Sequence, residues 1–278
     1  MPELPEVETV RRQLEPLMVG SRLASVSIRD SRLTRPLDPR AVEAALTGCT
    51  VASVNRRGKY LVFDLDGVNW LVHLRMTGAF LTTSTGTFDD PRHLRAVVQL
   101  DDGAGVGYRD VRRFGTWAVL TDQELDAFFT TRLGPEPLSK AFDQAWLSAR
   151  FARSGASVKA ALLDQTTAAG VGNIYADEAL WQAGVHPARA AGSLGDGEII
   201  DLVAAVRGAL TKGIERQGAT LRDYRAPDGA NGAMQDEFAV YGREGEPCNR
   251  CNSLVTKIRV AGRGTWFCPS CQPTSVTR

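Results

Sequence analysis

Long apolar runs and net charge are both scarce in this sequence. Among its 278 residues no stretch approaches the length needed to cross a bilayer, and the N-terminus lacks the basic-then-apolar pattern of a signal peptide. We therefore expect a cytoplasmic protein without a membrane partner. The formal net charge is only +1, so the average charge does not indicate a nucleic-acid partner either.

Two common kinds of catalytic motif are also absent. No serine or cysteine stands in a nucleophile-elbow context, and no glycine-rich loop has the spacing of a phosphate-binding P-loop. These absences argue against a hydrolytic triad and against P-loop nucleotide chemistry. The chain is nevertheless long enough for two modest domains, each with its own core.

Cysteine is rare, but four of the five cysteines are grouped. They form two Cys-x2-Cys pairs separated by sixteen residues: Cys248, Cys251, Cys268 and Cys271. Four thiolates at this spacing suit one tetrahedral zinc ion, with the intervening segment forming a hairpin. Two disulfides, the alternative, are disfavoured in a reducing cytosol. Because four thiolates leave no open coordination position, we predict a structural zinc ion, and we expect Cys49 to be a packed thiol.

Positive charge is concentrated near the C-terminus. Between Tyr241 and Arg278, six Arg or Lys residues accompany two Glu residues, a local net charge of +4. A basic segment on a nearly neutral protein can form a DNA-binding surface that the average conceals.

Hydrophobic periodicity divides the chain into a strand-rich first part and a helix-rich second part. Runs of β-branched, aromatic and leucine residues predict strands at 60–66, 70–74, 95–100 and 116–120. Short strands of this kind favour a β-sandwich or barrel. Two prolines and a glycine at 133–138 predict a linker. Apolar spacing predicts helices at 41–46, 122–129, 158–165, 173–183 and 198–214.

The first six residues, Met1 to Glu6, place a proline behind the initiator methionine. Removal of Met1 would leave Pro2 with a free secondary amine, and an α-amino group with a pKa of about 8 is partly unprotonated at neutral pH. Glu3 and Glu6 lie three residues apart, on one face of the helix that follows. An amine flanked by two carboxylates fits covalent catalysis with proton transfer. On these residues alone, an acidic turn that complements the helix dipole is the simpler interpretation.

A glycine-containing segment from Thr167 to Asn173 joins two of the predicted helices. Its glycines would let the backbone approach a ligand closely, and exposed amides at a helix start bind anions such as phosphate. A tight turn in which Asn173 only caps the second helix is an equally good interpretation.

Several motifs in one order resemble the formamidopyrimidine-DNA glycosylase family from end to end. They are Pro2–Thr9, His73–Gly78, Asp110–Gly115, the Leu133–Leu138 linker, Leu162–Gln165 with Asn173–Glu178, and the four-cysteine end. The resemblance implies an α+β fold. Its expected parts are an N-terminal β-sandwich with the first helix (1–132), a linker (133–150), a helix-two-turn-helix domain (151–234) and a zinc finger (235–278).

The resemblance also implies an activity in base excision repair. Members of this family excise oxidised purines, 8-oxoguanine and formamidopyrimidines, from duplex DNA, and then cut the strand at the abasic site by β,δ-elimination. The implied partner is duplex DNA containing oxidised bases or abasic sites, which suggests association with the nucleoid. We expect a monomer with one structural zinc ion and no organic cofactor.

Family motifs assign catalytic roles to five residues. By the resemblance, Pro2 attacks the sugar C1′ and Glu3 protonates the ring oxygen or the leaving group, while Glu6 holds the N-terminal turn in place. Lys59 matches the lysine that contacts phosphate and serves β-elimination, although a surface lysine beside a strand is its simpler interpretation. Arg263, at the expected tip of the zinc hairpin, would bind phosphates flanking the lesion and assist δ-elimination.

Further positions match family residues that contact DNA. Met76, Arg112 and Phe114 match a triad that fills the stack after a base is flipped out, with core packing as the alternative for the two apolar side chains. Asn173 aligns as a phosphate ligand. His93 and Arg153 align more loosely with DNA-contact positions, and we expect His73 and His186 to be structural.

One segment departs from the family pattern. After Leu221-Arg222-Asp223-Tyr224 the family usually carries an aromatic pair before Gln, whereas this chain has Gly232-Ala233-Met234-Gln235. Broader purine or pyrimidine substrates therefore stay open. One alternative is an endonuclease VIII-like enzyme for oxidised pyrimidines, which typically begins Pro-Glu-Gly. The other is a non-catalytic, zinc-dependent binder of DNA structures, against which the intact Pro2, Glu3 and Lys59 argue.

Overall fold

A computed structural model of the chain describes residues 1–221 and 224–274. Three residues named above lie outside the described residues: Arg222, Asp223 and Arg278. The first two precede the altered loop, Gly232–Gln235, which departs from the family pattern, and Arg278 was counted in the basic C-terminal segment. The chain divides into two compact units. The first comprises Met1–Thr131 with Arg216–Ala233, and the second comprises Arg132–Glu215 with the segment from Met234 onward.

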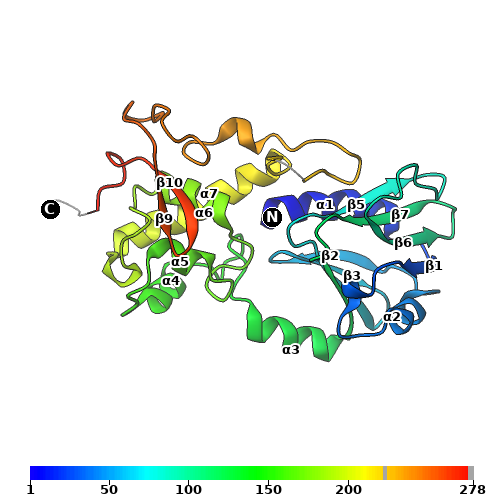
Figure 1. The fold of residues 1–278 in the computed structure, drawn as a ribbon. Coiled ribbons are helices and arrows are strands. Elements are labelled where there is room, and N and C mark those ends of the chain that lie inside the picture. The colour runs from blue at the N-terminus through cyan, green and yellow to red at the C-terminus, as the bar shows by residue number, and fades with distance from the viewer. Residues whose placement is uncertain (222–223, 275–278) are drawn as a thin grey trace. The chain divides into compact units, whose positions relative to one another are not determined.

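The first unit is built on two four-stranded antiparallel sheets (Figure 1). One sheet has the order β1 (Leu23–Ile28), β6 (Leu94–Leu100), β7 (Gly105–Asp110) and β5 (Gly78–Thr83). The other has the order β2 (Ser53–Arg57), β3 (Tyr60–Asp64), β4 (Val68–His73) and β8 (Thr116–Thr121). The helices of this unit are α1 (Leu4–Met18), η1 (Ser31–Thr34), α2 (Pro39–Leu46) and α3 (Asp122–Arg132).

Aromatic side chains from both sheets share one core. Trp70 stacks on Phe63 with ring centroids 4.3 Å apart and meets Trp117 at 4.6 Å, all within the second sheet. Phe80 from the first sheet meets Trp70 edge to face at 6.2 Å. Since large aromatic rings bury much apolar area and prefer such offset contacts, they fix the two sheets as a sandwich.

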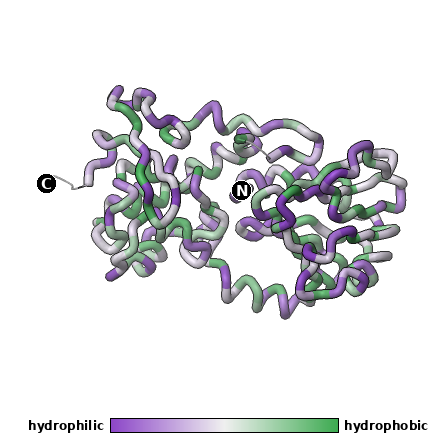
Figure 2. The backbone as a smooth tube through the Cα atoms, in the orientation of Figure 1, coloured by the Kyte–Doolittle hydropathy of each residue, from purple (hydrophilic) through white to green (hydrophobic). Residues whose placement is uncertain are grey.

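Helix α1 closes this core with one apolar stripe. Its buried members recur at helical spacing and are at most 1% exposed: Leu4, Val7, Val10, Leu14 and Met18. Helix α3, by contrast, buries no side chain, and it carries hydrophilic and hydrophobic residues along its length (Figure 2). Phe128 and Phe129 of α3 meet Tyr60 of β3 edge to face.

The second unit is mainly helical. Its elements are α4 (Gln144–Phe151), α5 (Val158–Leu163), α6 (Asn173–Gln182), η2 (Ala191–Ser193), α7 (Asp196–Glu215), η3 (Met234–Glu237), β9 (Thr256–Val260) and β10 (Arg263–Phe267). Helices α6 and α7 pack so closely that a Cβ atom on Gly213 would lie 2.4 Å from the ring of Tyr175. Glycine at this position is therefore a packing requirement. Among the described residues, no helix is both long and apolar enough to span a membrane.

The segment expected to be a linker is ordered against α7. The Arg207 guanidinium donates hydrogen bonds to the carbonyl oxygens of Pro137, Ser139 and Phe142, at 2.7 to 3.1 Å. Helix α4 also begins inside the range 133–150. The four-part division of the chain stays a prediction.

Candidate active site and metal centre

The N-terminal turn brings the predicted amine and both predicted carboxylates together. Pro2 is buried behind an exposed Met1, and Glu3 and Glu6 are only 3% and 2% exposed. One carboxylate oxygen of Glu6 accepts a hydrogen bond from the Glu3 amide at 2.8 Å, and the other accepts one from the Ala219 amide at 2.8 Å. Glu6 therefore fixes the start of α1 and joins it to segment 216–233.

Segment 216–233 has further contacts with α1. The Tyr224 hydroxyl lies 3.3 Å from the Glu6 carbonyl oxygen, to which it donates. Gln13 and Asp228 exchange two hydrogen bonds of 3.1 and 3.2 Å. A Cβ atom on Gly232 would lie 2.2 Å from the carbonyl oxygen of Gly218, so this part of the altered loop has no room for a side chain.

Lys59 lies in the tight turn between β2 and β3. It is 6% exposed, so the interpretation as an ordinary surface lysine does not hold. Arg56 orders this turn, because its guanidinium donates to the Gly58 carbonyl oxygen at 3.0 Å and to the Glu8 carboxylate at 3.1 Å. Burial raises the pKa of Glu8, but Arg11, Arg12 and Arg56 outweigh it and lower the pKa overall. A charged Glu8 thus joins the Lys59 turn to α1.

His73 ends β4 beside this turn. Its ring meets Tyr60 edge to face at 4.6 Å, and its Nδ1 accepts a hydrogen bond from the Arg75 amide at 2.9 Å. Burial, together with the charges of Arg75 and Lys59, lowers the pKa of His73 to about 3. The ring is therefore neutral at physiological pH, and its contacts are those of the structural residue that we expected.

His73 should make stability depend on pH. The unfolded chain binds a proton at His73 near pH 6.5, whereas the folded chain does so only at about 3. The contribution of neutral His73 to stability is therefore fully present above pH 6.5. Below that pH the free energy of unfolding falls by up to about 1.4 kcal/mol per pH unit as the pH drops toward 3. We expect His73→Gln to flatten this slope in urea unfolding followed by tryptophan fluorescence at pH 7, 6 and 5. Parallel slopes for both proteins would contradict the assignment.

The predicted intercalating side chains are exposed on loops of the β-sandwich unit. Met76 is 38% exposed and Phe114 is 51% exposed, so core packing does not explain either of them. The Arg112 guanidinium lies over the Phe114 ring, 4.7 Å from its centroid. His93 is exposed, with φ at 61°, and its Nδ1 lies 3.1 Å from Nη2 of Arg95.

The remaining predicted DNA contacts belong to the second unit. Arg263 begins β10 directly after the two-residue turn Ala261-Gly262, whose φ angles of 47° and 76° suit a tight hairpin. Asn173 begins α6, and its side-chain amide donates to the Gly264 carbonyl oxygen at 3.0 Å. The cap of this helix is Gly172, so the interpretation of Asn173 as a cap is wrong. Arg153 is exposed, with φ at 59°.

A buried ion pair that sequence reasoning missed supports the hairpin next to Arg263. Lys159 and Asp177 have fully buried side chains, and Nζ lies 2.7 Å from Oδ1. Lys159 also donates to the Gly264 carbonyl and the Thr265 hydroxyl, while Asp177 accepts from the Trp266 amide. Burial raises the pKa of Asp177 to about 7 against the opposing charge of Lys159. The one available signal was a lysine inside an otherwise apolar helix.

The four paired cysteines converge at one point. Their Sγ atoms all lie within 4.8 Å of one another, with close approaches of 3.5 Å (Cys251 to Cys268 and to Cys271) and 3.9 Å (Cys248 to Cys271). A tetrahedral zinc ion with bonds of about 2.3 Å needs sulfur atoms about 3.8 Å apart, so this cluster fits the metal. Cys49 lies outside it, half-buried against the sandwich core as expected.

The first cysteine knuckle is anchored on α6. The Trp181 indole donates to the Cys248 sulfur at 3.4 Å. Burial raises the pKa of Cys248, but hydrogen bonds from the Arg250 amide and the indole lower it to about 6. The Arg250 guanidinium stacks on the Trp181 ring, 3.9 Å from its centroid, and donates to the Trp181 and Gln182 carbonyls at the end of the helix.

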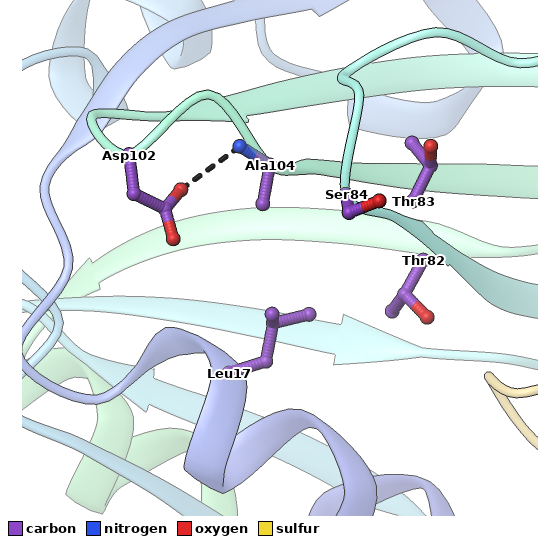
Figure 3. A pocket seen from close by; sticks show the side chains of 6 residues that line it. All are labelled: Leu17, Thr82, Thr83, Ser84, Asp102 and Ala104. Atoms are coloured by element: carbon purple, nitrogen blue, oxygen red, sulfur yellow. Dashed lines mark hydrogen bonds between the residues drawn. The ribbon is translucent and has the colours of Figure 1, made fainter.

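A cavity elsewhere on the first unit does not involve the predicted residues. It has a volume of about 310 Å³ and lies between the end of α1 and the loops that follow β5 and β6 (Figure 3). The Asp102 carboxylate accepts a hydrogen bond from the Ala104 amide at 2.9 Å. The lining residues are Leu17, Thr82, Thr83, Ser84, Asp102 and Ala104.

Comparisons with known proteins match the whole chain. The formamidopyrimidine-DNA glycosylase N-terminal domain matches residues 1–117, the H2TH domain of the same enzyme matches 133–225, and the zinc finger found in FPG and IleRS matches 245–274. A formamidopyrimidine-DNA glycosylase of Geobacillus kaustophilus is 46% identical over 274 residues, which cover 98% of this chain and 100% of that one. The chain belongs to the formamidopyrimidine-DNA glycosylase family.

Solved structures of this family agree with the fold. A mutant of the Lactococcus lactis FPG, in complex with DNA containing Fapy-dG, has a TM-score of 0.91 and 40% identity, covering 98% of this chain and 100% of that one. The wild-type Lactococcus lactis FPG, in complex with DNA containing an oxidised pyrimidine, has a TM-score of 0.90 and 39% identity with the same coverage. The predicted α+β fold with its helix-two-turn-helix domain and zinc hairpin is confirmed. The chain is a DNA glycosylase that acts on damaged DNA, and its four paired cysteines form a structural zinc site.

Proposed function

We propose that this enzyme excises oxidised purines, 8-oxoguanine and formamidopyrimidines, from duplex DNA and then cleaves the abasic site as a lyase. The observation that carries the proposal is the N-terminal turn. It holds Pro2 beside two buried carboxylates, Glu3 and Glu6, at the start of α1. Removal of Met1 converts the Pro2 nitrogen from an amide into a secondary amine, which is a nucleophile at neutral pH.

Each step follows from ordinary amine chemistry. The Pro2 nitrogen attacks C1′ of the damaged nucleotide, the glycosidic bond breaks, and the base leaves with the electron pair and a proton from Glu3. The Pro2 nitrogen then loses its proton, and its lone pair breaks the C1′–O4′ bond, which opens the sugar ring with a proton added to O4′ and leaves an iminium. This iminium acidifies the C2′ proton, so that loss of this proton expels the 3′ phosphate. A second elimination expels the 5′ phosphate, and water then releases Pro2.

The other predicted residues act on DNA around these steps. Lys59 is proposed to contact phosphate and serve β-elimination, and Arg263 to bind flanking phosphates and assist the second elimination. Met76, Arg112 and Phe114 are proposed to fill the gap left by the flipped base. His93, Arg153 and Asn173 are proposed to contact the DNA backbone. The zinc ion holds the hairpin that presents Arg263.

Oxidised pyrimidines form a second class of substrate. The Lactococcus lactis FPG has been solved in complex with DNA containing an oxidised pyrimidine, and the loop between Gly232 and Gln235 lacks the aromatic pair typical of the family. A loop with smaller side chains imposes fewer shape constraints on a flipped base.

Borohydride trapping on a panel of lesions tests this proposal. We expect single-turnover excision to be fastest for 8-oxoguanine and formamidopyrimidine opposite cytosine. Borohydride should trap a covalent adduct, and peptide mapping should locate it at Pro2. Pro2→Gly should trap much less. The Pro2 mechanism would be refuted if the wild-type enzyme nicked DNA without forming an adduct, or if Pro2→Gly trapped as much adduct as the wild type. Faster excision of oxidised pyrimidines than of oxidised purines would reverse the proposed substrate order.

A further inference from the structure

The two loops that carry Met76, Arg112 and Phe114 are tied to one buried carboxylate. Asp110, at the end of β7, is 0% exposed. Its Oδ1 accepts a hydrogen bond from the Thr77 hydroxyl at 2.5 Å, and its Oδ2 accepts one from the Gly115 amide at 2.7 Å. The Thr77 hydroxyl in turn accepts a hydrogen bond from the Arg112 amide at 3.0 Å. Asp110 thus binds Thr77, which follows Met76, and Gly115, which follows Phe114. Through Thr77 it is also linked to the Arg112 amide.

A tyrosine hydroxyl lies beneath the same two loops. Tyr108 is 0% exposed, and among the described residues its hydroxyl has no hydrogen-bond partner. A Cβ atom would lie 2.2 Å from this hydroxyl if built on Gly78 and 1.9 Å from it if built on Gly115. Both loops therefore reach β7 through glycines that close over Tyr108, so their positions are set by contact as well as by hydrogen bonds.

A third segment reaches the same residue through its backbone. The Arg95 guanidinium donates to the Asp110 carbonyl oxygen at 2.8 Å, and the Asp110 amide donates to the His93 carbonyl oxygen at 2.9 Å. Every backbone and carboxylate oxygen of Asp110 therefore accepts a hydrogen bond. Hydrogen bonds to a charged and buried group are among the stronger ones in proteins, so this arrangement is rigid.

We propose that Thr77 and Asp110 form a positioning pair that presets the two loops for intercalation into duplex DNA. This inference rests on the proposed function. Intercalating side chains lose less conformational entropy on binding when they already have their bound positions. Placing them within about 0.5 Å of those positions needs supporting residues behind them. Thr77 is 9% exposed and Asp110 is 0% exposed, so the pair supplies that support from beneath the two loops.

Thr77→Val tests the pair, because valine has the same shape but neither donates to Asp110 nor accepts from Arg112. We expect single-turnover excision from duplex DNA to fall about ten-fold, as for loss of a hydrogen bond to a buried charge. Excision of the same lesion from a single strand should change far less, since little stacking has to be replaced there. Discrimination between cytosine and adenine opposite the lesion should also weaken.

Three further variants separate positioning from general stability. Thr77→Ser keeps the hydroxyl and should restore the wild-type ratio of duplex to single-strand rates. Thr77→Ala removes the hydroxyl without adding a branched side chain, and it should reproduce the fall in duplex excision expected for Thr77→Val. Thr34→Val is the matched control, because Thr34 is also buried in this unit but donates to the Leu37 carbonyl. It should leave the ratio unchanged.

The outcomes distinguish this inference from the proposed function. The positioning role would be overturned if Thr77→Val and Thr77→Ala kept the wild-type ratio of duplex to single-strand rates. It would also be overturned if Thr77→Ser or Thr34→Val lowered this ratio as much as Thr77→Val does. Either result would leave the glycosylase activity in place. Absence of excision and of borohydride adducts in the wild-type enzyme would overturn the proposed function, and the positioning role with it.

Discussion

Glu3→Gln is expected to slow base excision by roughly 10²- to 10⁴-fold, the range of a lost general acid, while cleavage of a preformed abasic site changes little. Glutamine has the shape of the carboxyl group but cannot deliver its proton to a departing base. Elimination from an existing aldehyde does not need that proton. The Glu3 backbone amide would still donate to Glu6, so the N-terminal turn should persist. Single-turnover excision of 8-oxoguanine and nicking of abasic DNA measure the two steps separately.

The same helix supplies a control for this substitution. Glu15 of α1 is half-exposed and pairs with Arg11 at 2.9 Å, so Glu15→Gln should leave both steps unchanged. Equal loss in the two assays for Glu3→Gln would make Glu3 a structural residue. A loss confined to abasic-site cleavage would move its role to the lyase step.

Cys248→Ser is expected to remove zinc and to weaken DNA binding strongly. Zinc binding to a structural four-cysteine site contributes on the order of 10 kcal/mol or more to folding of the finger, so a broken site should leave the hairpin unfolded. Metal content measured with DNA affinity would show both losses together. Cys49→Ser should keep one zinc ion per chain, because Cys49 lies outside the cluster. Tight DNA binding by a verified metal-free protein would contradict this account.

Arg263→Ala separates the metal from the contact that the metal supports. The variant should retain zinc and bind lesion DNA more weakly. One fewer phosphate contact should also make the salt dependence shallower by about 0.9 in log–log slope. An unchanged slope would remove Arg263 from the phosphate contacts.

The sequence predicted about half of the sandwich strands closely. Strands β3, β4, β6 and β8 lie within two residues of the predicted ranges, because each is an apolar run with clear turn residues beside it. Strands β1, β2, β5 and β7 were missed. Leu23–Ile28 alternates with serines, Ser53–Arg57 ends in charges, and Gly105–Asp110 has two glycines. These segments are strands because neighbouring strands pair with them, which a local pattern does not reveal.

The candidate site shows the same division. Spacing was enough to predict the four-cysteine cluster. Motif order named Pro2, Glu3 and Lys59 as candidates, and their catalytic roles stay predictions. The Lys159–Asp177 pair and the Thr77–Asp110 pair join residues 18 and 33 positions apart, and only the fold brings them into contact. Sequence signals for such supporting residues are weak: Lys159 stands out only as a lysine in an otherwise apolar helix, and nothing in the sequence names its partner.

Helix α6 makes the zinc hairpin part of a larger cooperative unit. Asp177 binds the Trp266 amide, Glu178 accepts hydrogen bonds from three successive amides at 239–241, and Trp181 contacts Cys248. Local opening of the hairpin would therefore leave the buried carboxylates of Asp177 and Glu178 without these hydrogen-bond donors. Slow hydrogen–deuterium exchange should extend from α6 into β10, with both segments exchanging at one common rate. The finger is accordingly not a detachable module: a peptide of 245–274 alone would bind metal but lose the register that places Arg263.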